Sequence, residues 1–279
     1  MSTEPSRTSG RVRDWLRLTS ACFSHSHTGA TTDKAPKRWL VPILPLGLLL
    51  GLTTVARGQS FAPGWPAFLA SRDGFPPEVV STVERVWSEP TLHRTVHGRP
   101  ARVPFAIYVA FVDSPDVTAA AARFRELASY EVEPLDEDRY LADDHDGARG
   151  VYRVLVRESH RRVMVSWGQH SSRILGTIHG SALTDLELTP RGDAVEQTLT
   201  AYVRIDNRLA AAIARLLIPL FGFLADRKLA EGIGVSAAVA EWAVEEPEAF
   251  CAWLVNEPLR PERRARILTV LPSCREVVS

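Results

Sequence analysis

Three histidines and one aspartate are the side chains whose types could do acid–base chemistry. His160, His170 and His179 lie at or near the ends of segments that alternate polar and apolar residues. An imidazole moves protons near neutral pH, and Asp185 could complete a pair with His179 if both faced one cavity. His179 directly follows Ile178, however, and neighbouring residues of a strand point to opposite faces. We therefore assign no catalytic residue from these histidines.

The run "DDHD" at residues 143–146 holds residue types that bind metal ions. Adjacent residues of a turn seldom converge on one ion, and the following Gly147 is typical of a hairpin tip, so we interpret the run as a solvated turn. The sequence contains no G-x-S-x-G, H-E-x-x-H or C-x-x-C motif and no glycine-rich phosphate loop. We expect no metal and no cofactor, and the sequence names no reaction.

One arginine lies inside the apolar run "LAAAIARLLIPLFGFLADRK" at residues 209–228. At the centre of a membrane span, Arg215 would cost roughly 2.5–3.5 kcal/mol, which nearly cancels the roughly 0.3–0.6 kcal/mol returned by each Leu, Ile and Phe. The run then ends abruptly in charged residues. A soluble helix is therefore favoured over a membrane span. In such a helix, Arg215 lies on an outer stripe or meets an anionic ligand head.

The composition is that of an ordinary globular protein without excess charge. The chain has 279 residues, with 33 Lys+Arg against 33 Asp+Glu. This balance gives no electrostatic reason to expect nucleic acid as a partner, because nucleic acid is bound by basic surfaces. The length suffices for one large domain or two small ones, and a hydrophobic fraction of 45% excludes disorder over the whole chain.

The amino-terminal part predicts export or membrane anchoring. Residues 1–38 are rich in Ser, Thr and Arg and lack an apolar period, which is typical of a disordered leader. An uncharged run then extends from Trp39 to Ala56, directly after a basic flank that predicts a cytoplasmic amino terminus. A signal peptide cleaved after Gly58 and an uncleaved single anchor both fit this run, and a buried core helix is the remaining alternative. With either membrane signal, we expect the rest of the chain outside the cytoplasm, at the cell membrane or exported.

Two of the three cysteines, Cys251 and Cys274, lie in the part that would be exported, whereas Cys22 lies in the leader. A pair of cysteines in an oxidising compartment can form a disulfide. The sequence carries no geometry that decides whether these two are bonded, so both states stay open.

The elements that would position these side chains begin after the leader. Residues 76–87 ("PPEVVSTVERVW") place valines at helical spacing and predict an amphipathic helix. Residues 102–113 ("RVPFAIYVAFVD") are rich in β-branched and aromatic residues, and we predict a strand there. Ser114 and Pro115 then suit the start of a helix that continues through "VTAAAARFREL".

An antiparallel series follows, from about residue 130 to residue 206. Its segments alternate apolar and polar residues and are separated by turn sequences such as "TPRGD". They are "YEVEPLDEDRYLAD", "VYRVLVRE", "RVMVSWG", "ILGTIHGSALTDLEL" and "AVEQTLTAYVRID". One apolar and one polar face is the pattern of an antiparallel sheet packed on one side only. The long apolar helix comes after the last strand.

This order of elements resembles the helix-grip fold of the START-like superfamily of polyketide cyclases and lipid-transfer proteins. The resemblance covers roughly residues 102–229 and rests on "FVDSPDVTAAAARFREL", the hairpin "LTPRGDAVEQTLTAYV" and the helix "RLAAAIARLLIPLFGFLADRKL". It implies an α+β fold in which a curved antiparallel sheet grips the long helix, with a ligand cavity between them. The superfamily has no invariant catalytic signature, so the resemblance implies a fold and not a reaction.

The resemblance also implies which side chains line such a cavity. Tyr202 is left out, because it alternates with Leu199 and Val203 and points to the opposite face. Pro219 and Gly222 are expected to kink the long helix over the cavity. The expected lining comprises Tyr152, Val154, Val165, Trp167, Ile178, Leu199, Val203, Arg215, Phe221 and Phe223.

Five parts of the chain are expected: a disordered leader (1–38), a signal peptide or anchor (39–58), a helical lead-in (59–101), a START-like domain (102–230) and a C-terminal helical extension (231–279). We expect a membrane-anchored or exported protein that binds an apolar small molecule or lipid, more a carrier than an enzyme. An enzyme of the cyclase or hydrolase kind and an interaction protein without a cavity are the alternatives. A cavity of about 300 Å³ or more favours a ligand. The sequence identifies neither the ligand nor a protein partner.

Overall fold

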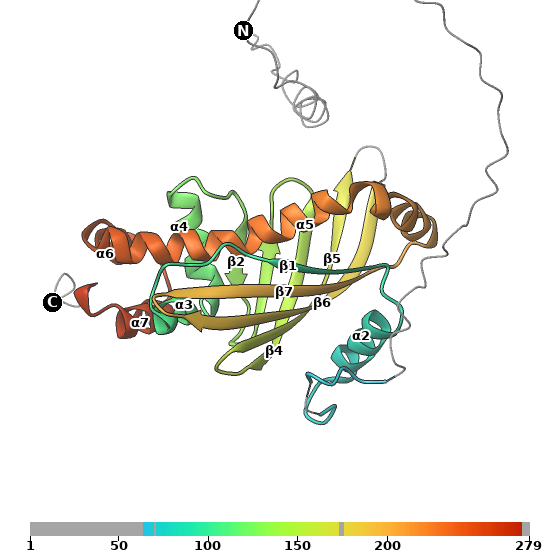
Figure 1. Ribbon diagram of the computed structural model, residues 1–279, viewed down its shortest axis with the longest axis horizontal. Helices are drawn as coiled ribbons and strands as arrows, with labels where there is room; N and C mark the ends of the chain where they lie inside the picture. The colour runs from blue at the N-terminus through green and yellow to red at the C-terminus, as the bar shows by residue number, and fades with distance from the viewer. Residues whose placement is uncertain (1–63, 70, 173–175, 275–279) are drawn as a thin grey trace, which may run out of the picture. The chain divides into compact units, whose positions relative to one another are not determined.

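The computed structural model describes residues 64–69, 71–172 and 176–274 (Figure 1). All of these residues belong to one compact unit. The leader and the apolar run that starts at Trp39 lie outside the described residues, so the expectations for residues 1–38 and 39–58 stay predictions.

A seven-stranded antiparallel sheet forms the centre of this unit, with the strand order β1-β7-β6-β5-β4-β3-β2 (Figure 1). The strands from β2 to β7 form a meander, and β1 pairs with β7. The bounds are β1 (Leu92–His97), β2 (Glu131–Pro134), β3 (Arg139–Asp143), β4 (Ala148–Arg157), β5 (Arg161–Ser172), β6 (Gly176–Arg191) and β7 (Ala194–Ile205). The segments that alternate in the sequence are therefore strands, as predicted.

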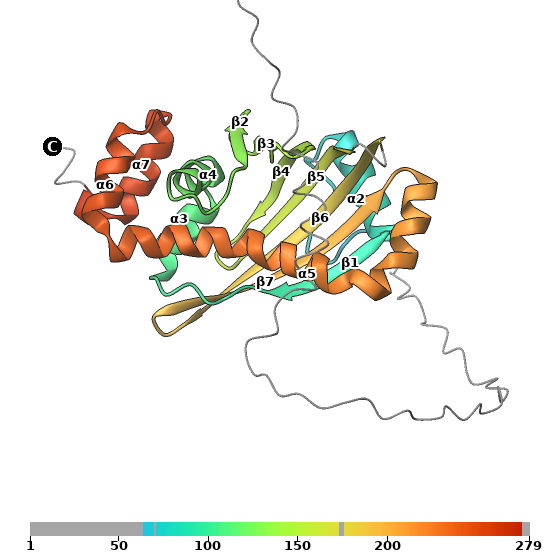
Figure 2. The ribbon, with the colours of Figure 1, turned by 90° about the horizontal axis from the view of Figure 1, so that it is seen from above.

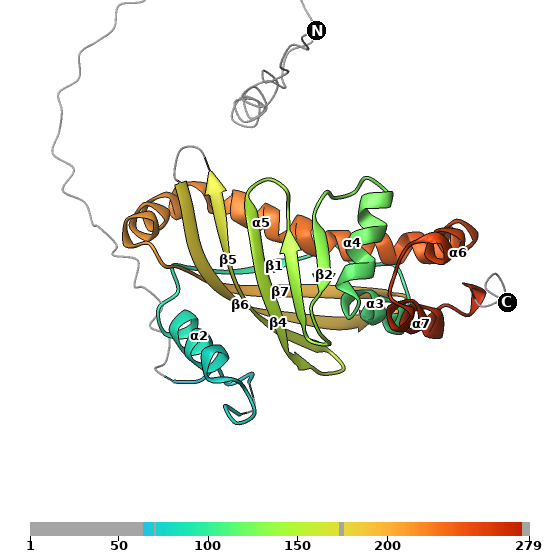
Figure 3. The same ribbon diagram turned by 180° about the vertical axis from the view of Figure 1, so that it is seen from behind.

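Helices lie on both faces of the sheet (Figures 2 and 3). They are α2 (Pro77–Ser88), α3 (Phe105–Val112), α4 (Pro115–Phe124), α5 (Arg208–Glu245), α6 (Pro247–Asn256) and α7 (Pro261–Val270). We call the face that packs against α5 the grip face, and the opposite face the α2 face. The helices α3, α4, α6 and α7 gather at one end of the sheet (Figures 1 and 3).

Each face has its own apolar core. On the grip face, Leu186, Leu188 and Leu199 pack with α3, α4, α6, α7 and the carboxyl-terminal half of α5. On the α2 face, the α2 valines pack with Val163, Val165, Leu183 and Tyr202. The expectation of a sheet packed on one side only is therefore wrong, because the apolar stripe of α2 is buried on the second face.

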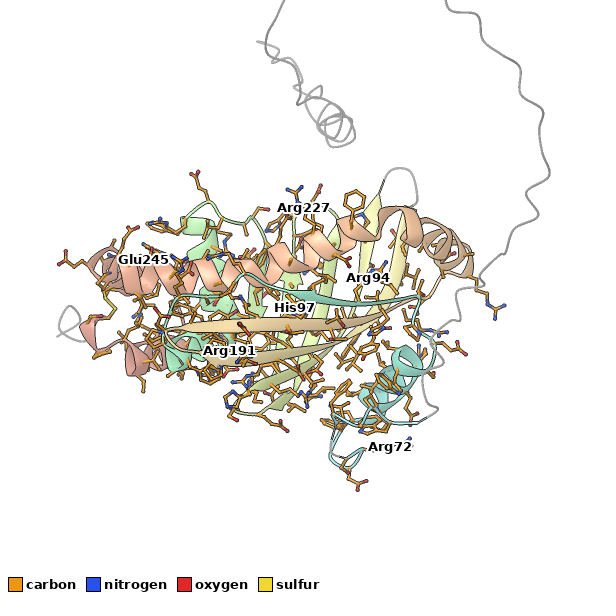
Figure 4. The ribbon with its side chains drawn as sticks, in the orientation of Figure 1. Arg72, Arg94, His97, Arg191, Arg227 and Glu245 are labelled. Atoms are coloured by element: carbon orange, nitrogen blue, oxygen red, sulfur yellow. A yellow bond between two sulfur atoms is a disulfide. The ribbon has the colours of Figure 1, made fainter. Side chains whose placement is uncertain are left out.

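The α5 helix is held against β1 and the segment that follows it by two ion pairs. Arg99 donates hydrogen bonds of 2.9 and 2.6 Å to the two carboxylate oxygens of Glu241. Arg94 on β1 lies 3.2 Å from Asp226 on α5 (Figure 4). Asp226 lies at the charged end of the apolar run and Glu241 lies beyond it, so this part of the helix is fixed to the edge of the sheet.

The long helix predicted after the last strand is present and longer than expected. It is one continuous element of 38 residues, so the domain boundary expected at residue 230 falls inside it. Its apolar amino-terminal half contains Pro219 and Gly222, and Figure 2 shows a change of direction in this half. Proline removes an intrahelical hydrogen bond and bends a helix, which accounts for a bend here.

The structure overturns the strand predicted at residues 102–113. Phe105–Val112 is the helix α3, and the edge strand β1 lies at Leu92–His97, inside the expected lead-in. A short apolar run cannot be assigned from periodicity alone, because a buried strand and a buried helix look alike in sequence. Tyr108 and Phe111 on α3 are fully buried, so apolar residues surround this helix. The sheet therefore begins at β1 and not at residue 102.

A buried ion pair connects the α3–α4 turn to the β4–β5 hairpin. Arg162 is 5% exposed, and its guanidinium donates to the two carboxylate oxygens of Asp113 at 2.6 and 2.8 Å. The next residue, Ser114, stands at the amino-terminal cap of α4 as expected but makes no side-chain capping hydrogen bond. The turn is thus held by Asp113 and not by the predicted cap.

Cys251 and Cys274 form a disulfide across 23 residues, with their Cα atoms 5.0 Å apart. It joins α6 to the short 3₁₀ helix η1 (Pro272–Cys274), and both cysteines are buried. The structure therefore decides the pairing that the sequence left open.

In the described part of the chain, no single helix is long and apolar enough to cross a membrane. The helices α3 and α4 meet that criterion only as a pair, and they are bent by 94° relative to each other.

Candidate functional site

A hollow of about 600 Å³ lies on the part of the sheet that α3 and α4 leave uncovered. Small and apolar residues dominate the grip-face side chains around it. The grip-face residues that border the hollow are Ala142, Ala148, Gly150, Tyr152, Ser166, Gly168, His170, Ile178, Gly180, Ala182, Val203 and Ile205, together with Tyr130 from the segment before β2. The hollow therefore lies on the face that the fold expectation assigned to a ligand.

Three paired glycines form the floor of this hollow, and we call them the glycine row. Gly150 pairs with Gly168, and Gly168 pairs with Gly180, across the strands β4, β5 and β6. A Cβ atom on Gly168 would lie 2.7 Å from the carbonyl oxygen of Arg149 and 2.9 Å from the Cα of Gly150. Because no side chain fits there, the backbones approach closely and the space above them stays open.

The inner wall of the hollow is the next row of residues, where the open half of the grip face meets the packed half. Tyr152 and Ala182 both pair with Ser166 in this row, and Ala182 also pairs with Val203. The ring of Tyr152 stacks on the ring of Tyr140, with centroids 5.1 Å apart. Tyr140 is fully buried, so Tyr152 marks the border between hollow and core.

Burial sets the protonation state of two phenols at the hollow. It raises the pKa of Tyr152 well above 10, and the neighbouring Tyr140 and Asp116 raise it further. Burial also raises the pKa of Tyr130, although the charge of Arg123 acts in the opposite direction. Both phenols are therefore neutral hydroxyl groups at neutral pH and can donate as well as accept a hydrogen bond.

The expected cavity residues separate into groups. Tyr152, Ile178 and Val203 border the hollow. Val154 shares their face without bordering it, and Leu199 is packed in the grip-face core.

Two further expectations concern the other face of the sheet. Val165 packs in the α2-face core, and Trp167 packs against that core although it borders the hollow. Both pack on the side away from α5, which corrects their assignment to a cavity beneath that helix. The physical reason is that β5 points its apolar residues toward α2. The apolar side of its alternation is therefore the α2 face and not the grip face. Tyr202 also belongs to the α2-face core, as its parity predicted.

The expected contacts from α5 are only partly described. The side chains of Arg215 and Phe221 lie outside the described set, so their roles stay predictions. Phe223 is 60% exposed, which places it away from a buried lining.

The acid–base pair considered for His179 and Asp185 is not formed. They are six positions apart on β6, which corresponds to roughly 20 Å along a strand. Asp185 instead lies 3.1 Å from the guanidinium of Arg161. His160 lies at the β4–β5 hairpin, where its Nδ1 is 3.1 Å from the carbonyl oxygen of Leu188.

The run "DDHD" forms the turn between β3 and β4. The carboxylate of Asp143 accepts a hydrogen bond from the backbone of His145, and that of Asp144 accepts from Asp146 and Ala148. These bonds are what short acidic side chains make in turns, as predicted. Within the described residues, no cluster of three or more metal-ligating side chains is present.

Two parts of the site were missed by sequence reasoning. Tyr130 opens the predicted strand segment "YEVEPLDEDRYLAD" but lies just before β2, and the alternation of that segment did not identify it as a residue at the hollow. Gly150 and Gly168 form the floor only because the register pairs them, and register cannot be read from the separate strands. A signal was present at Gly180, because a glycine among the apolar residues of a strand leaves space for a neighbour.

Comparisons with known proteins find solved structures that are similar to this chain only at low identity. No family model and no curated protein matches this chain. A conserved protein from Geobacillus kaustophilus is 14% identical, with a TM-score of 0.41, over 54% of this chain and 97% of that one. Ara h 8.0201 is 10% identical, with a TM-score of 0.37, over 55% of this chain and 99% of that one.

The di-domain ARO/CYC BexL, from the BE-7585A biosynthetic pathway, is 12% identical, with a TM-score of 0.35, over 59% of this chain and 55% of that one. All three TM-scores lie below 0.5, so these likenesses carry no argument about function. The expected α+β architecture is confirmed by the sheet and α5 themselves, with an open antiparallel sheet beside one long carboxyl-terminal helix.

Proposed function

We propose that this protein binds an apolar small molecule or lipid in the hollow on the grip face. The observation that supports this most is the hollow itself, whose volume of about 600 Å³ lies within the range of small-molecule sites. Its floor is the glycine row, and Ile178, Ala182 and Val203 supply apolar walls. Burial of apolar ligand surface against such walls supplies the binding free energy.

We further propose that the protein acts at the membrane or outside the cytoplasm. The apolar run that starts at Trp39 supplies the signal or anchor. The disulfide between Cys251 and Cys274 supports this location, because disulfides persist in oxidising compartments. Labelling of thiols in intact cells tests it: these two cysteines should react with a maleimide only after reduction. Reaction without prior reduction would contradict the location.

An enzyme of the cyclase or hydrolase kind is the alternative function. His170 and Tyr152 are two titratable side chains that border the hollow. His170 pairs with Ala148, which precedes Tyr152 by four residues on β4, so the two side chains lie roughly 13 Å apart along the strand direction. That distance is too long for direct proton transfer between them. Binding is therefore the function that the described geometry favours.

Binding can be tested with the full-length chain, purified in mild detergent, and the neutral probe N-phenyl-1-naphthylamine, whose fluorescence rises in apolar surroundings. Ala182→Phe places a ring in the hollow and should weaken probe binding by at least about tenfold, or about 1.4 kcal/mol, because the ring occupies space that the probe would fill. Ala265→Phe makes the same change at an exposed position of α7 and should leave binding unaltered. Equal binding by the wild type and Ala182→Phe, or no binding by the wild type, would overturn the proposal.

A further inference from the structure

A second hollow, of about 440 Å³, lies on the α2 face of the sheet, between the strands β4 to β6 and the helix α2. We call it the α2-face hollow. The helix α2 lies on the opposite face of the sheet from α5 (Figures 1 and 3). The glycine row borders both hollows, so one layer of backbone lies between them. The polar side chains of the α2-face hollow take no part in the proposed function.

A row of polar side chains crosses the α2-face hollow. Arg149 on β4 pairs with Gln169 on β5, and Gln169 pairs with His179 on β6. These three residues, which we call the polar row, are the chain neighbours of the glycine row, so their side chains point to the α2 face. Paired residues of antiparallel strands have Cβ atoms about 4.5–5.5 Å apart, so neighbouring members of the polar row can bind one group together.

Trp167 and Ser181 form the inner end of the α2-face hollow. They pair with each other two positions along the strands from the polar row, which corresponds to about 7 Å. Ser181 is only 7% exposed, and its hydroxyl group makes no hydrogen bond to another described residue. A buried hydroxyl group without a partner costs free energy, so the inner end of this hollow offers a hydrogen-bonding group to a ligand.

The helix α2 supplies the opposite wall of this hollow through Thr82 and Arg85, which are three positions apart and share one side of the helix. Among the described residues, the guanidinium of Arg85 makes no ion pair and no hydrogen bond. On the sheet, the Nε of Arg149 has a carboxylate oxygen of Asp143 at 3.8 Å, which is too long for a hydrogen bond. Two guanidinium groups from different elements therefore border one hollow with their donors largely unused.

The charged groups at the α2-face hollow favour an anion. Arg85 and Arg149 supply two positive charges, and Asp206 supplies one negative charge. The backbone N–H of Asp206 donates to the carbonyl oxygen of His179 at 3.0 Å, so Asp206 extends the polar row beyond β6. Asp206 therefore lies three strand spacings from Arg149, or about 14 Å. The Arg149 end of the hollow is thus left with a positive potential.

We infer that the α2-face hollow binds a phosphate group, carried by a soluble phosphate ester or by the headgroup of a lipid. Arg149 and Gln169 donate hydrogen bonds to it from the sheet, and Arg85 donates from the helix. Donors on two sides suit a tetrahedral phosphate, whose oxygens point in several directions, better than a planar carboxylate. Hydrogen bonds from guanidinium groups to phosphate oxygens are assisted by charge. This site is independent of the ligand hollow on the grip face.

Isothermal titration calorimetry of the full-length chain with phenyl phosphate tests the site. Benzoate is the matched probe, because it places a planar carboxylate on the same ring. The wild type should bind phenyl phosphate more tightly than benzoate, and added salt should weaken this binding because exposed charges are screened. Phenyl phosphate should not displace N-phenyl-1-naphthylamine, which occupies the other hollow.

Four variants assign the binding to residues. Arg85→Gln and Arg149→Gln each remove one guanidinium and should weaken the binding of phenyl phosphate about three- to tenfold, the effect of one charged hydrogen bond reduced by solvent screening. Asp206→Asn removes the negative charge and should tighten it. Arg191→Gln makes the same charge change at the β6–β7 hairpin, where Arg191 pairs with Glu196, and should leave binding unaltered. All four substituted positions are exposed, so these variants should fold.

Two further probes separate the sources of the phosphate group. Dihexanoyl phosphatidic acid carries a lipid headgroup in a water-soluble form, and glycerol 3-phosphate carries the same phosphate without acyl chains. Tighter binding of dihexanoyl phosphatidic acid that Arg85→Gln weakens would support the inference with a lipid headgroup as the source. Equal binding of the two probes, again weakened by Arg85→Gln, would support it with a soluble ester.

The contrary outcomes are distinct from failure of the proposed function. No binding of phenyl phosphate by the wild type, or equal binding by the wild type, Arg85→Gln and Arg149→Gln, would overturn the inference. Benzoate bound as tightly as phenyl phosphate would overturn the choice of phosphate. Displacement of N-phenyl-1-naphthylamine by phenyl phosphate would place both in the grip-face hollow and overturn the second site, while the proposed function stands. The proposed function fails where the wild type does not bind N-phenyl-1-naphthylamine, whatever phenyl phosphate does.

Discussion

Adding one methyl group to the glycine row tests the floor of the hollow. In Gly168→Ala, the new Cβ would lie 2.7 Å from the carbonyl oxygen of Arg149, which is closer than such atoms approach one another. The strands β4 and β5 must separate to admit it, and overpacking of this kind costs about 1–3 kcal/mol. The lower entropy of alanine in the unfolded chain returns about 0.4–1 kcal/mol. We expect a net loss of about 1–2 kcal/mol.

A second glycine provides the matched control. Gly232 lies inside α5, and a Cβ added there meets nothing within 4 Å. Gly232→Ala should therefore raise the free energy of unfolding by about 0.5–1 kcal/mol, because alanine is the better helix former. Urea unfolding followed by tryptophan fluorescence measures both variants under one set of conditions. If Gly168→Ala is neutral or stabilising, the close approach of β4 and β5 is refuted.

The remaining predictions concern the disulfide and two ion pairs. Replacing Cys251 and Cys274 by serine should lower the free energy of unfolding by about 3 kcal/mol, the chain-entropy value for 23 residues, and dithiothreitol added to the wild type should reproduce this loss in urea unfolding. Asp113→Ala leaves the buried guanidinium of Arg162 without its carboxylate and should cost about 3–5 kcal/mol, most of which Arg162→Met in the same chain should restore. Burial raises the pKa of Glu241, but its hydrogen-bonded arginine partners outweigh burial and hold that pKa below the ordinary value. This stabilisation is present above the unfolded-state pKa and is lost as the pH falls through the folded-state pKa, so the difference in Tm between wild type and Glu241→Gln should shrink on acidification; a constant difference would contradict the assignment.

Local patterns were sufficient to predict most of the sheet and the long helix. Each strand from β4 to β7 alternates along its own length, and the hairpin sequences between them contain turn residues. Alternation also placed Tyr152, Ile178 and Val203 on one face, which is the face that borders the hollow. The alternation of residues between the two faces of a strand depends only on neighbouring residues, so a single sequence is enough to detect it.

Other parts of the site depend on contacts between distant segments. Trp167 was assigned to the wrong face because β5 has an apolar partner, α2, that its own sequence does not reveal. The glycine row needs the register of three strands. The α2-face hollow brings together residues of α2 and β4 that lie far apart in sequence, Arg85 and Arg149. The helix α3 was taken for a strand, because eight apolar residues suit either element when both are buried.

The most direct test of the ligand hollow is methyl NMR of the full-length chain during titration with N-phenyl-1-naphthylamine. The methyl signals of Ile178, Ala182 and Val203 on the grip face should shift with a common saturation curve. Those of Val83 and Leu183, which pack on the α2 face, should stay in place. Shifts confined to the α2 face, or no shifts at saturating probe, would contradict a ligand site on the grip face.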